Sequence, residues 1–229
     1  LCQLLSINIE TLRQRFDAIR NRNINPGYSP YTPQRLLAQV SAGDAGRFQE
    51  HLYKFPGFSV QHRSIRRYGT EVAAHVLGYM SECSPTDLEQ DSLLAPGDYV
   101  GKSGIERTYD AVLRGTKGYK VMLRDARGRI QGHYNNGAND RKEMAGHNLT
   151  LSIDEGLQAL GERMMQGKRG AIVMIEPATG EVLCLVTSPA YSPSLLAGRD
   201  IGKNHLLLAY NPNKPLFNRA LQGSYPPGS

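Results

Sequence analysis

The sequence feature that most constrains the fold is the stretch AIVMIEPATGEVLCLVTSP at residues 171–189. Two apolar runs flank the turn PATG, a pattern typical of an antiparallel β-hairpin. Apolar residues fill every position from 171 to 175 and from 182 to 186, so each predicted strand is apolar on both faces. A hairpin cannot bury two faces by itself. We therefore expect it to belong to a larger sheet that is covered on both sides.

Composition fits a soluble globular chain of one or two domains, with 229 residues, 40% hydrophobic and 21% charged. The 24 glycines, the 13 prolines and the absence of tryptophan favour a turn-rich α+β chain over a helical bundle. No apolar run approaches the roughly 20 residues that a membrane span needs, and no signal peptide opens the sequence. A missing segment is expected as readily upstream of Leu1 as downstream of the last residue.

The formal net charge is +6. The densest basic clusters, HRSIRR at 62–67 and RDARGR at 124–129, are short. A basic chain can bind nucleic acid or lipid headgroups, but a mildly basic solvated surface gives the same composition. The second interpretation is favoured because no nucleic-acid motif accompanies the charge.

Cysteine and histidine usage indicates no metal site. The three cysteines, Cys2, Cys83 and Cys184, are odd in number and widely spaced, which excludes a disulfide framework and a CxxC site. Cys184 lies in the apolar run VLCLV and is predicted to be a small buried hydrophobe. The six histidines show no ligand spacing, so we expect no metal and no cofactor.

Periodicity predicts three helices and one extended segment before residue 80. Ser6 or Asn8 is expected to cap the first helix, and Ser41 with Asp44 resembles a capping box for the second. The third is expected to end near Gly78. The predicted ranges are 6–22, 43–53 and 70–80 for the helices and 55–61 for the extended segment, in which Phe58 and Val60 alternate.

Residues 101–118, GKSGIERTYDAVLRGTKG, predict one further helix. Ser103 and Glu106 have the spacing of a capping box, and Gly115 fits the position after the helix. The preceding GDYVGKS resembles a phosphate-binding loop, but only three residues separate its glycines where that motif has four. We therefore interpret Gly-Lys-Ser as a helix start.

A β-hairpin is predicted at 120–134, followed by a polar junction at 135–147. Beyond the junction, LTLSI at 149–153 is strand-like, and Ser152 with Glu155 forms a third capping-box pattern. The helix that follows is expected to pack through Leu157, Leu160 and Met164. Glu176 and Glu181 flank the PATG turn and are interpreted as solvated turn residues.

The C-terminal motifs carry a family resemblance. GAIVMIEPATGEVLCLVTSPAYSP followed by NRALQGSYPPGS resembles the opening of the transpeptidase domain of a class B penicillin-binding protein. RRYGTEVAAHVLGY and GKSGIERTYDAVLRGTKG are similar to motifs of the pedestal domain in that family, and DARGR and NLTLSIDEGLQ continue the usual order. The resemblance spans roughly residues 55–229 and is nearest to the elongation-type subtype, chiefly through PLFNRALQGSYPPGS.

Two departures from the family pattern stand out. The family has a proline directly after the tyrosine and a glycine two residues later, whereas Gly69 and Thr70 follow Tyr68 here. The family motif R-G-x-I-x-D-R-x-G is absent and is expected upstream of Leu1, with a membrane anchor further upstream still.

The resemblance implies an α+β architecture in two parts. An elongated pedestal domain of the dimerisation type would occupy residues 1–145. An incomplete β-lactamase/transpeptidase-like α/β domain would occupy residues 146–229, supplying two strands of a larger sheet.

The resemblance also implies a chemistry. Ser229 would be the first residue of the S-x-x-K motif and the acyl nucleophile of D-alanyl-D-alanine transpeptidation, acting on peptidoglycan stem peptides. β-lactams would acylate the same serine. Because the motif's lysine would follow the last residue, we expect this polypeptide to be inactive and to form no covalent β-lactam adduct.

A non-catalytic role is the alternative. Residues 1–145 would then serve as a pedestal that docks a SEDS-type glycosyltransferase and other proteins of the elongation machinery, at the periplasmic face of the inner membrane. A serine β-lactamase is disfavoured because those enzymes lack a long pedestal before their serine, and nucleic acid is not expected as a partner.

Overall fold

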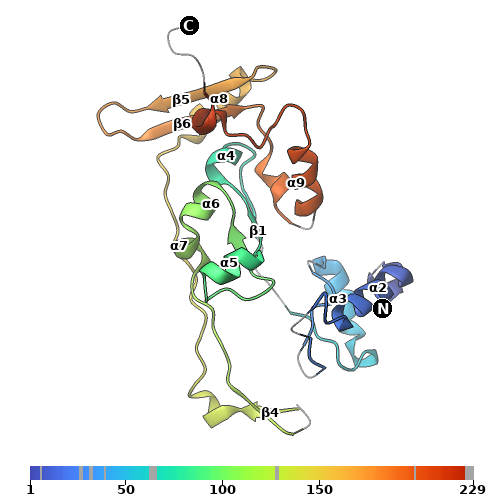
Figure 1. The fold of residues 1–229 in the computed structure, drawn as a ribbon. Helices are drawn as coiled ribbons and strands as arrows, with labels where there is room; N and C mark the ends of the chain where they lie inside the picture. The colour runs from blue at the N-terminus through green and yellow to red at the C-terminus, as the bar shows by residue number, and fades with distance from the viewer. Residues whose placement is uncertain are drawn as a thin grey trace. The chain divides into compact units, whose positions relative to one another are not determined.

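The computed structural model describes residues 1–5, 7–25, 28–30, 33–38, 40–61, 66–126, 129–198 and 200–224. Helices alternate with three two-stranded sheets, which confirms the expected α+β class. The chain forms two compact units: one comprises Leu1–Ser64 with Arg124–Gln131, the other Ile65–Leu123 with Gly132–Ser229. Figure 1 shows the ribbon coloured along the chain.

The first unit is built from short helices: α1 (Cys2–Leu5), α2 (Ile9–Arg20), α3 (Ala42–Glu50) and the 3₁₀ turn η1 (Leu52–Lys54). Asn8 caps α2 by accepting a hydrogen bond from the Glu10 backbone N–H at 3.0 Å. Ser41 caps α3 in the same way, accepting from Asp44. The two helices predicted at 6–22 and 43–53 are confirmed, with Asn8 as the first cap.

Four phenylalanines pack together in this unit. The ring centroids of Phe48 and Phe55 lie 5.4 Å apart, and those of Phe16 and Phe58 lie 6.4 Å apart, edge to face. Phe58 also packs edge to face on Phe48. Phe58 and Val60 are half-buried and alternate with exposed residues as predicted after the turn at 56–57, but residues 55–61 form no paired strand.

The second unit begins with α4 (Ala74–Leu77), β1 (Met80–Glu82), α5 (Pro85–Gln90), β2 (Tyr99–Gly101), α6 (Gly104–Thr108) and α7 (Asp110–Arg114). Helix α4 ends at Gly78 as predicted, with φ 80°, but starts later than residue 70. Gly115, with φ 72°, follows α7 as predicted. The helix predicted after residue 103 is broken at Tyr109, whose φ of −112° and ψ of 21° separate α6 from α7.

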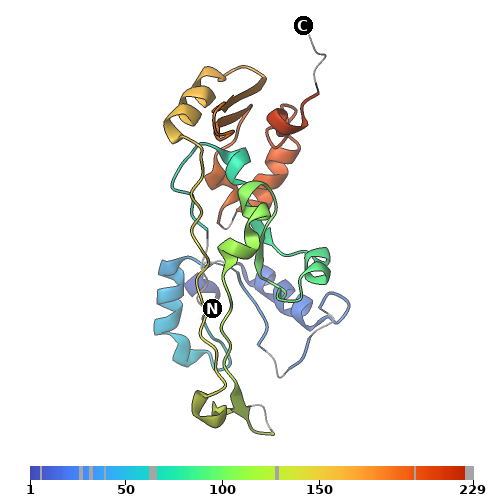
Figure 2. The same ribbon diagram turned by 90° about the vertical axis from the view of Figure 1, so that its left-hand side faces the viewer.

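A long double ribbon extends from α7. Strands β3 (Met122–Arg124) and β4 (Ile130–His133) pair as the predicted hairpin. Bridges between Thr116 and Met144 and between Tyr119 and Arg141 extend the pairing. In Figures 1 and 2 the two chain segments run side by side. The polar stretch 135–147, which shows no sequence pattern, is thus partly paired and also contains most of the 3₁₀ turn η2 (Tyr134–Gly137).

The C-terminal half contains α8 (Glu155–Met164), β5 (Gly170–Ile175), β6 (Val182–Ser188), the turn η3 (Pro193–Leu196), α9 (Ile201–Ala209) and α10 (Arg219–Gln222). Strands β5 and β6 form the predicted antiparallel hairpin, with Gly170 opposite Ser188. Cys184 and Val186 of β6 are 1% exposed beneath α8. Cys184 is therefore the buried hydrophobe that the sequence predicts.

Of the three residues predicted to pack in α8, only Leu157 is half-buried. Leu160 and Met164 are 45% and 58% exposed, whereas Gln158 and Gly161 are buried. The Gln158 amide exchanges two hydrogen bonds with the backbone of Leu185, at 2.9 and 3.0 Å. Gly161 lets the helix approach β6 closely. The apolar periodicity was misleading because an amide and a glycine make the contact.

The start of α8 also differs from the prediction. Asp154 is the cap, accepting from the Leu157 N–H at 2.8 Å. The Ser152 hydroxyl instead donates to the carbonyl of Val182 at 2.9 Å, so the capping box of Ser152 with Glu155 is wrong. Residues 149–153 form no strand.

Cover of the β5–β6 hairpin is uneven among the described residues. Helix α8 covers Cys184 and Val186, and α10 is bonded to Thr187 of β6. In contrast, Val173, Met174 and Ile175 of β5 are 43–54% exposed. The predicted cover on both sides is thus present at β6 and missing along the second half of β5.

Candidate functional site

The predicted nucleophile Ser229 lies outside the described residues. The structure instead describes the elements before it in the chain: the turn 211–217, helix α10, and the parts of α4, α8 and β6 around them. These elements form the candidate site.

Asn218 ties the start of α10 to the sheet. Its side-chain oxygen accepts hydrogen bonds from the Leu221 N–H at 3.1 Å and from the Thr187 hydroxyl at 3.2 Å. The Thr187 oxygen accepts in turn from the Ala220 N–H at 3.4 Å. Helix α10 is therefore attached to β6 through a threonine that is 2% exposed.

Arg219 organises the turn before α10. Its guanidinium is buried and donates to the carbonyls of Asn213, Lys214 and Phe217 at 2.7, 3.2 and 3.3 Å. Lys214 has a left-handed backbone, with φ 49°. A buried cation with three carbonyl partners is well satisfied and fixes the shape of the turn.

Helix α4 contacts this turn through His75. The ring Nε2–H donates to the carbonyl of Pro215 at 2.8 Å, and the ring packs edge to face on Tyr191 with centroids 5.1 Å apart. Burial lowers the pKa of His75. The hydrogen bond to Pro215 opposes this shift and the nearby Arg219 cation adds to it, and the net result is a pKa below the ordinary value, which favours the neutral ring. Burial raises the pKa of Tyr191 to about 12.

A second set of contacts anchors the α4 region to α8 and η3. The Ala73 N–H donates to the Glu162 carboxylate of α8 at 2.7 Å. Ala73 has a φ of 62°, a left-handed conformation that is uncommon outside glycine. The carboxylate of Glu71 accepts from the hydroxyls of Ser192 and Ser194 beside η3.

A buried carboxylate lies under α4. Glu106 is 6% exposed, and its Oε1 accepts from Arg66 Nε at 2.8 Å. The Tyr68 hydroxyl donates to the same oxygen at 3.4 Å. Burial, followed by the negative charge of Glu106, raises the pKa of Tyr68. The capping box predicted for Ser103 and Glu106 is therefore wrong: Ser103 makes no side-chain cap, and Glu106 faces the Arg-x-Tyr motif.

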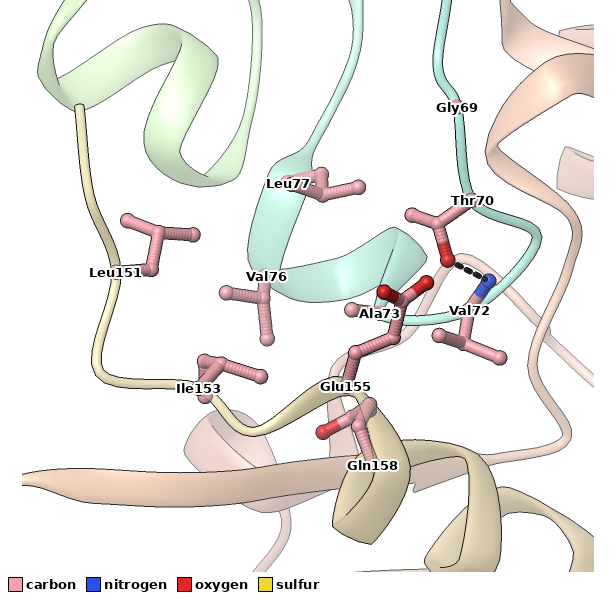
Figure 3. A pocket seen from close by; sticks show the side chains of 10 residues that line it. All are labelled: Gly69, Thr70, Val72, Ala73, Val76, Leu77, Leu151, Ile153, Glu155 and Gln158. Atoms are coloured by element: carbon pink, nitrogen blue, oxygen red, sulfur yellow. Dashed lines mark hydrogen bonds between the residues drawn. The ribbon is translucent and has the colours of Figure 1, made fainter. Parts of the chain in front are cut away.

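Two grooves flank α4, of about 330 and 310 Å³, and they share Leu77 and Leu151. Figure 3 shows the first, where side chains of α4 face Leu151 and Ile153 and the groove ends at Glu155 and Gln158 of α8. Its lining is otherwise apolar except for Thr70, whose hydroxyl accepts from the Val72 N–H. The full lining is Gly69, Thr70, Val72, Ala73, Val76, Leu77, Leu151, Ile153, Glu155 and Gln158.

Other site classes find no support in the described part of the chain. Lys102, in the loop that resembles a phosphate-binding loop, pairs with Asp87, and the hydrogen bond from Lys102 followed by those from Ser84 holds the pKa of Asp87 well below its usual range. The described residues contain no cluster of His, Cys, Asp or Glu suited to a metal. None of their helices combines the length and the apolar character of a membrane span.

Comparison with known proteins decides the family. The model of the penicillin-binding protein dimerisation domain matches residues 1–151. The chain belongs to the penicillin-binding proteins. A second model, the penicillin-binding protein transpeptidase domain, matches residues 170–229. The family inferred from the motifs is thereby confirmed.

Relatives with assigned names agree. The chain is 39% identical over 85% of its length to the peptidoglycan D,D-transpeptidase MrdA of Acinetobacter baumannii, and 32% identical over 99% to MrdA of Escherichia coli K12. It spans 29% and 38% of those proteins, so about a third of their length. A solved complex between penicillin-binding protein 2 and MreC from Helicobacter pylori matches 95% of this chain and 41% of that chain, with a TM-score of 0.69 and 25% identity.

Sequence reasoning found the motifs of this penicillin-binding protein but not the contacts between them. His75 lies inside RRYGTEVAAHVLGY and Pro215 lies just before NRA, yet no pattern in either segment predicts their hydrogen bond. The contacts of the buried Arg219 with its turn and of the buried Glu106 with Arg66 and Tyr68 were likewise not predicted. The one available signal was the type of these residues: charged side chains inside otherwise apolar motifs.

Proposed function

We propose that this chain belongs to a peptidoglycan D,D-transpeptidase that cross-links stem peptides during elongation of the cell wall. The observation that carries the proposal is the similarity, over 85% and 99% of the chain, to two proteins of that name. The buried Arg219 turn and the α10 cap support it, because they build the NRA segment that precedes the serine.

Ser229 is the proposed nucleophile. Its oxygen attacks the carbonyl of the penultimate D-Ala, the bond to the terminal D-Ala breaks, and D-Ala leaves with the proton. An amine of a neighbouring stem then attacks the acyl ester, and the serine regains its proton. A serine hydroxyl needs an adjacent base, which the S-x-x-K motif would supply from a lysine three residues after Ser229. β-lactams acylate the same oxygen.

The two parts of the chain divide near residue 145 in this proposal. Residues 1–145 form the pedestal, and residues 146–229 open the transpeptidase domain. The pedestal docks a SEDS-type glycosyltransferase and an MreC-like protein at the periplasmic face of the inner membrane. The similarity to a penicillin-binding protein 2 solved with MreC supports the second partner.

Covalent labelling tests the catalytic proposal. In the full-length enzyme, fluorescent penicillin should label the wild type, and Ser229→Ala should abolish the labelled band. Ser224→Ala is the matched control, because Ser224 is an exposed serine in the same segment. It should label normally. Undiminished labelling of Ser229→Ala would reject the assignment.

Docking is tested with this chain as it stands. We expect the immobilised chain to retain a purified SEDS-type glycosyltransferase and purified MreC separately. Retention of neither protein would contradict the docking role and leave the assignment of the serine untouched.

A further inference from the structure

His75 makes a hydrogen bond whose acceptor belongs to the segment before the serine. Its Nε2 lies 2.8 Å from the Pro215 carbonyl oxygen, across 140 residues of sequence. A hydrogen bond between such distant segments fixes their relative position in a way that local sequence cannot.

Pro215 lies in the turn that Arg219 organises. The guanidinium donates hydrogen bonds to the carbonyls of Asn213, Lys214 and Phe217, and His75 donates one to the carbonyl of Pro215. Four carbonyls of one short turn are thus held by two side chains. Arg219 is part of α10 itself, whereas His75 belongs to α4 and is the external support.

Helix α10 follows this turn in the chain and is attached to the sheet. Asn218 caps the helix and bonds Thr187, so the helix cannot rotate without breaking contacts to β6. Chain direction then leads from α10 through Ser224 toward Ser229. The turn and α10 are thus described elements that precede the proposed nucleophile in the chain.

The α4 region is itself held in place. Ala73 donates to Glu162 of α8, and Glu71 accepts from Ser192 and Ser194. His75 therefore projects from a fixed element and does not simply follow the turn.

The ring is held as a neutral donor. Tyr191 packs on one side of it, and Arg219 is the charged group that acts on it. The Pro215 carbonyl can only accept, so the neutral ring presents its proton on Nε2.

We propose that His75 is a positioning residue for acylation: through the Pro215 carbonyl it holds the Arg219 turn and α10, the described elements that precede Ser229 in the chain, and thereby supports acylation at that serine. The inference rests on the proposed function of Ser229. It assigns α4 a role in the rate of the chemical step and not only in joining two parts of the chain.

Variants that differ in reach test the proposal. In His75→Gln the amide nitrogen takes the place of Nε2 and can still donate to Pro215. In His75→Asn the shorter side chain leaves that carbonyl without its donor. The matched control is His205→Ala, which removes a histidine of α9 whose ring is hydrogen-bonded to Tyr79 and packs on it.

The measurement is penicillin acylation by the full-length enzyme, with the initial dissociation constant separated from the acylation rate constant. We expect His75→Asn to lower the rate constant by about 10- to 100-fold, as small misplacements of reacting groups do, with the dissociation constant little changed. His75→Gln should stay within about threefold of the wild type, and His205→Ala should match it.

Two results would overturn the inference: an unchanged acylation rate in His75→Asn, or a His75→Gln variant as slow as His75→Asn while its melting temperature matches the wild type. Failure of the function itself is recognised separately, because Ser229→Ala would then still be labelled.

Discussion

Two parts of the second unit are held together in opposite ways. In the backbone-packed part, residues 66–123 and 132–147, main chain lies against main chain. A Cβ atom added at Gly78 would meet the Ser103 carbonyl oxygen at 1.9 Å, and one at Gly101 would meet that of Glu106 at 1.9 Å. In the sheet part, residues 150–224, Gly180 and Gly202 face open space, and a Cβ atom added at Gly161 would meet side chains, those of Val186 and Cys184, and not backbone.

Buried charged groups occur in both parts but with opposite sign, because the sheet part buries the Arg219 cation. The backbone-packed part buries Glu106 and Asp110, and the Asp110 carboxylate accepts from the Gly101 N–H at 3.0 Å. The sheet part buries Cys184 and Val186 and exposes the apolar residues at the end of β5. The two parts therefore differ in how closely their main chains approach one another, and the exposed end of β5 is a surface that another element can cover.

The largest effect is expected at the glycine contacts. Gly101→Ala should destabilise the chain by more than about 4 kcal/mol, because its methyl group collides with a backbone carbonyl that cannot move aside. Gly202→Ala, in the exposed α9, should stabilise it by about 0.5–1 kcal/mol. Urea unfolding measures the change in the free energy of unfolding for both variants. Equal losses would contradict the difference between the two parts.

Next in size is the buried carboxylate. Glu106→Ala leaves Arg66 and Tyr68 without their acceptor and should cost about 3 kcal/mol, the low end for breaking a buried pair, because Arg66 is 37% exposed. The control Arg129→Ala removes an exposed pair with Asp125 and should cost less than about 0.5 kcal/mol. Thermal melting of the two variants compares their losses in free energy of unfolding. A loss below 1 kcal/mol in Glu106→Ala, about the value of an exposed pair, would contradict the role of Glu106.

The two strands of the hairpin should respond unequally. Val186→Ala removes about two buried methyl groups beneath α8 and should cost about 2 kcal/mol. Val173→Ala, at a residue 47% exposed, should cost less than about 0.5 kcal/mol. Similar losses in chemical denaturation would mean that β5 is covered as well as β6.

The smallest effect concerns pH. Because the pKa of His75 is lowered in the fold, the unfolded chain takes up the proton more readily. Stability is then fully present above the unfolded pKa of about 6.5 and falls as pH drops toward the folded value. His75→Gln should lose less stability than the wild type between pH 7.5 and 5.5. Parallel losses in the two proteins would contradict a neutral buried ring.

Local structure was predictable where one residue type decides it. Asn8, Ser41 and Gly115 end or begin helices as expected, and the PATG turn makes its hairpin. Prediction was wrong where a partner distant in sequence decides the contact. Glu106 pairs with Arg66 and does not cap its helix, and Gln158, not a leucine, makes the contact of α8 with β6.

The candidate site was predictable as a list of motifs and not as a network. Nothing near His75 in the sequence indicates that its acceptor is Pro215, because the bond depends on how the parts of the second unit fold together. The nucleophile itself was assigned by resemblance to a family and stays a prediction.

The Gln158 amide has one more consequence, for the direction in which the sheet can grow. It occupies both the N–H and the C=O of Leu185, and the Asp154 N–H occupies the C=O of Leu183 at 2.9 Å. The side of β6 away from β5 is therefore closed to a further strand at these residues. An open strand edge invites pairing, so added strands, from the rest of a transpeptidase domain or from another molecule, are directed to the outer side of β5.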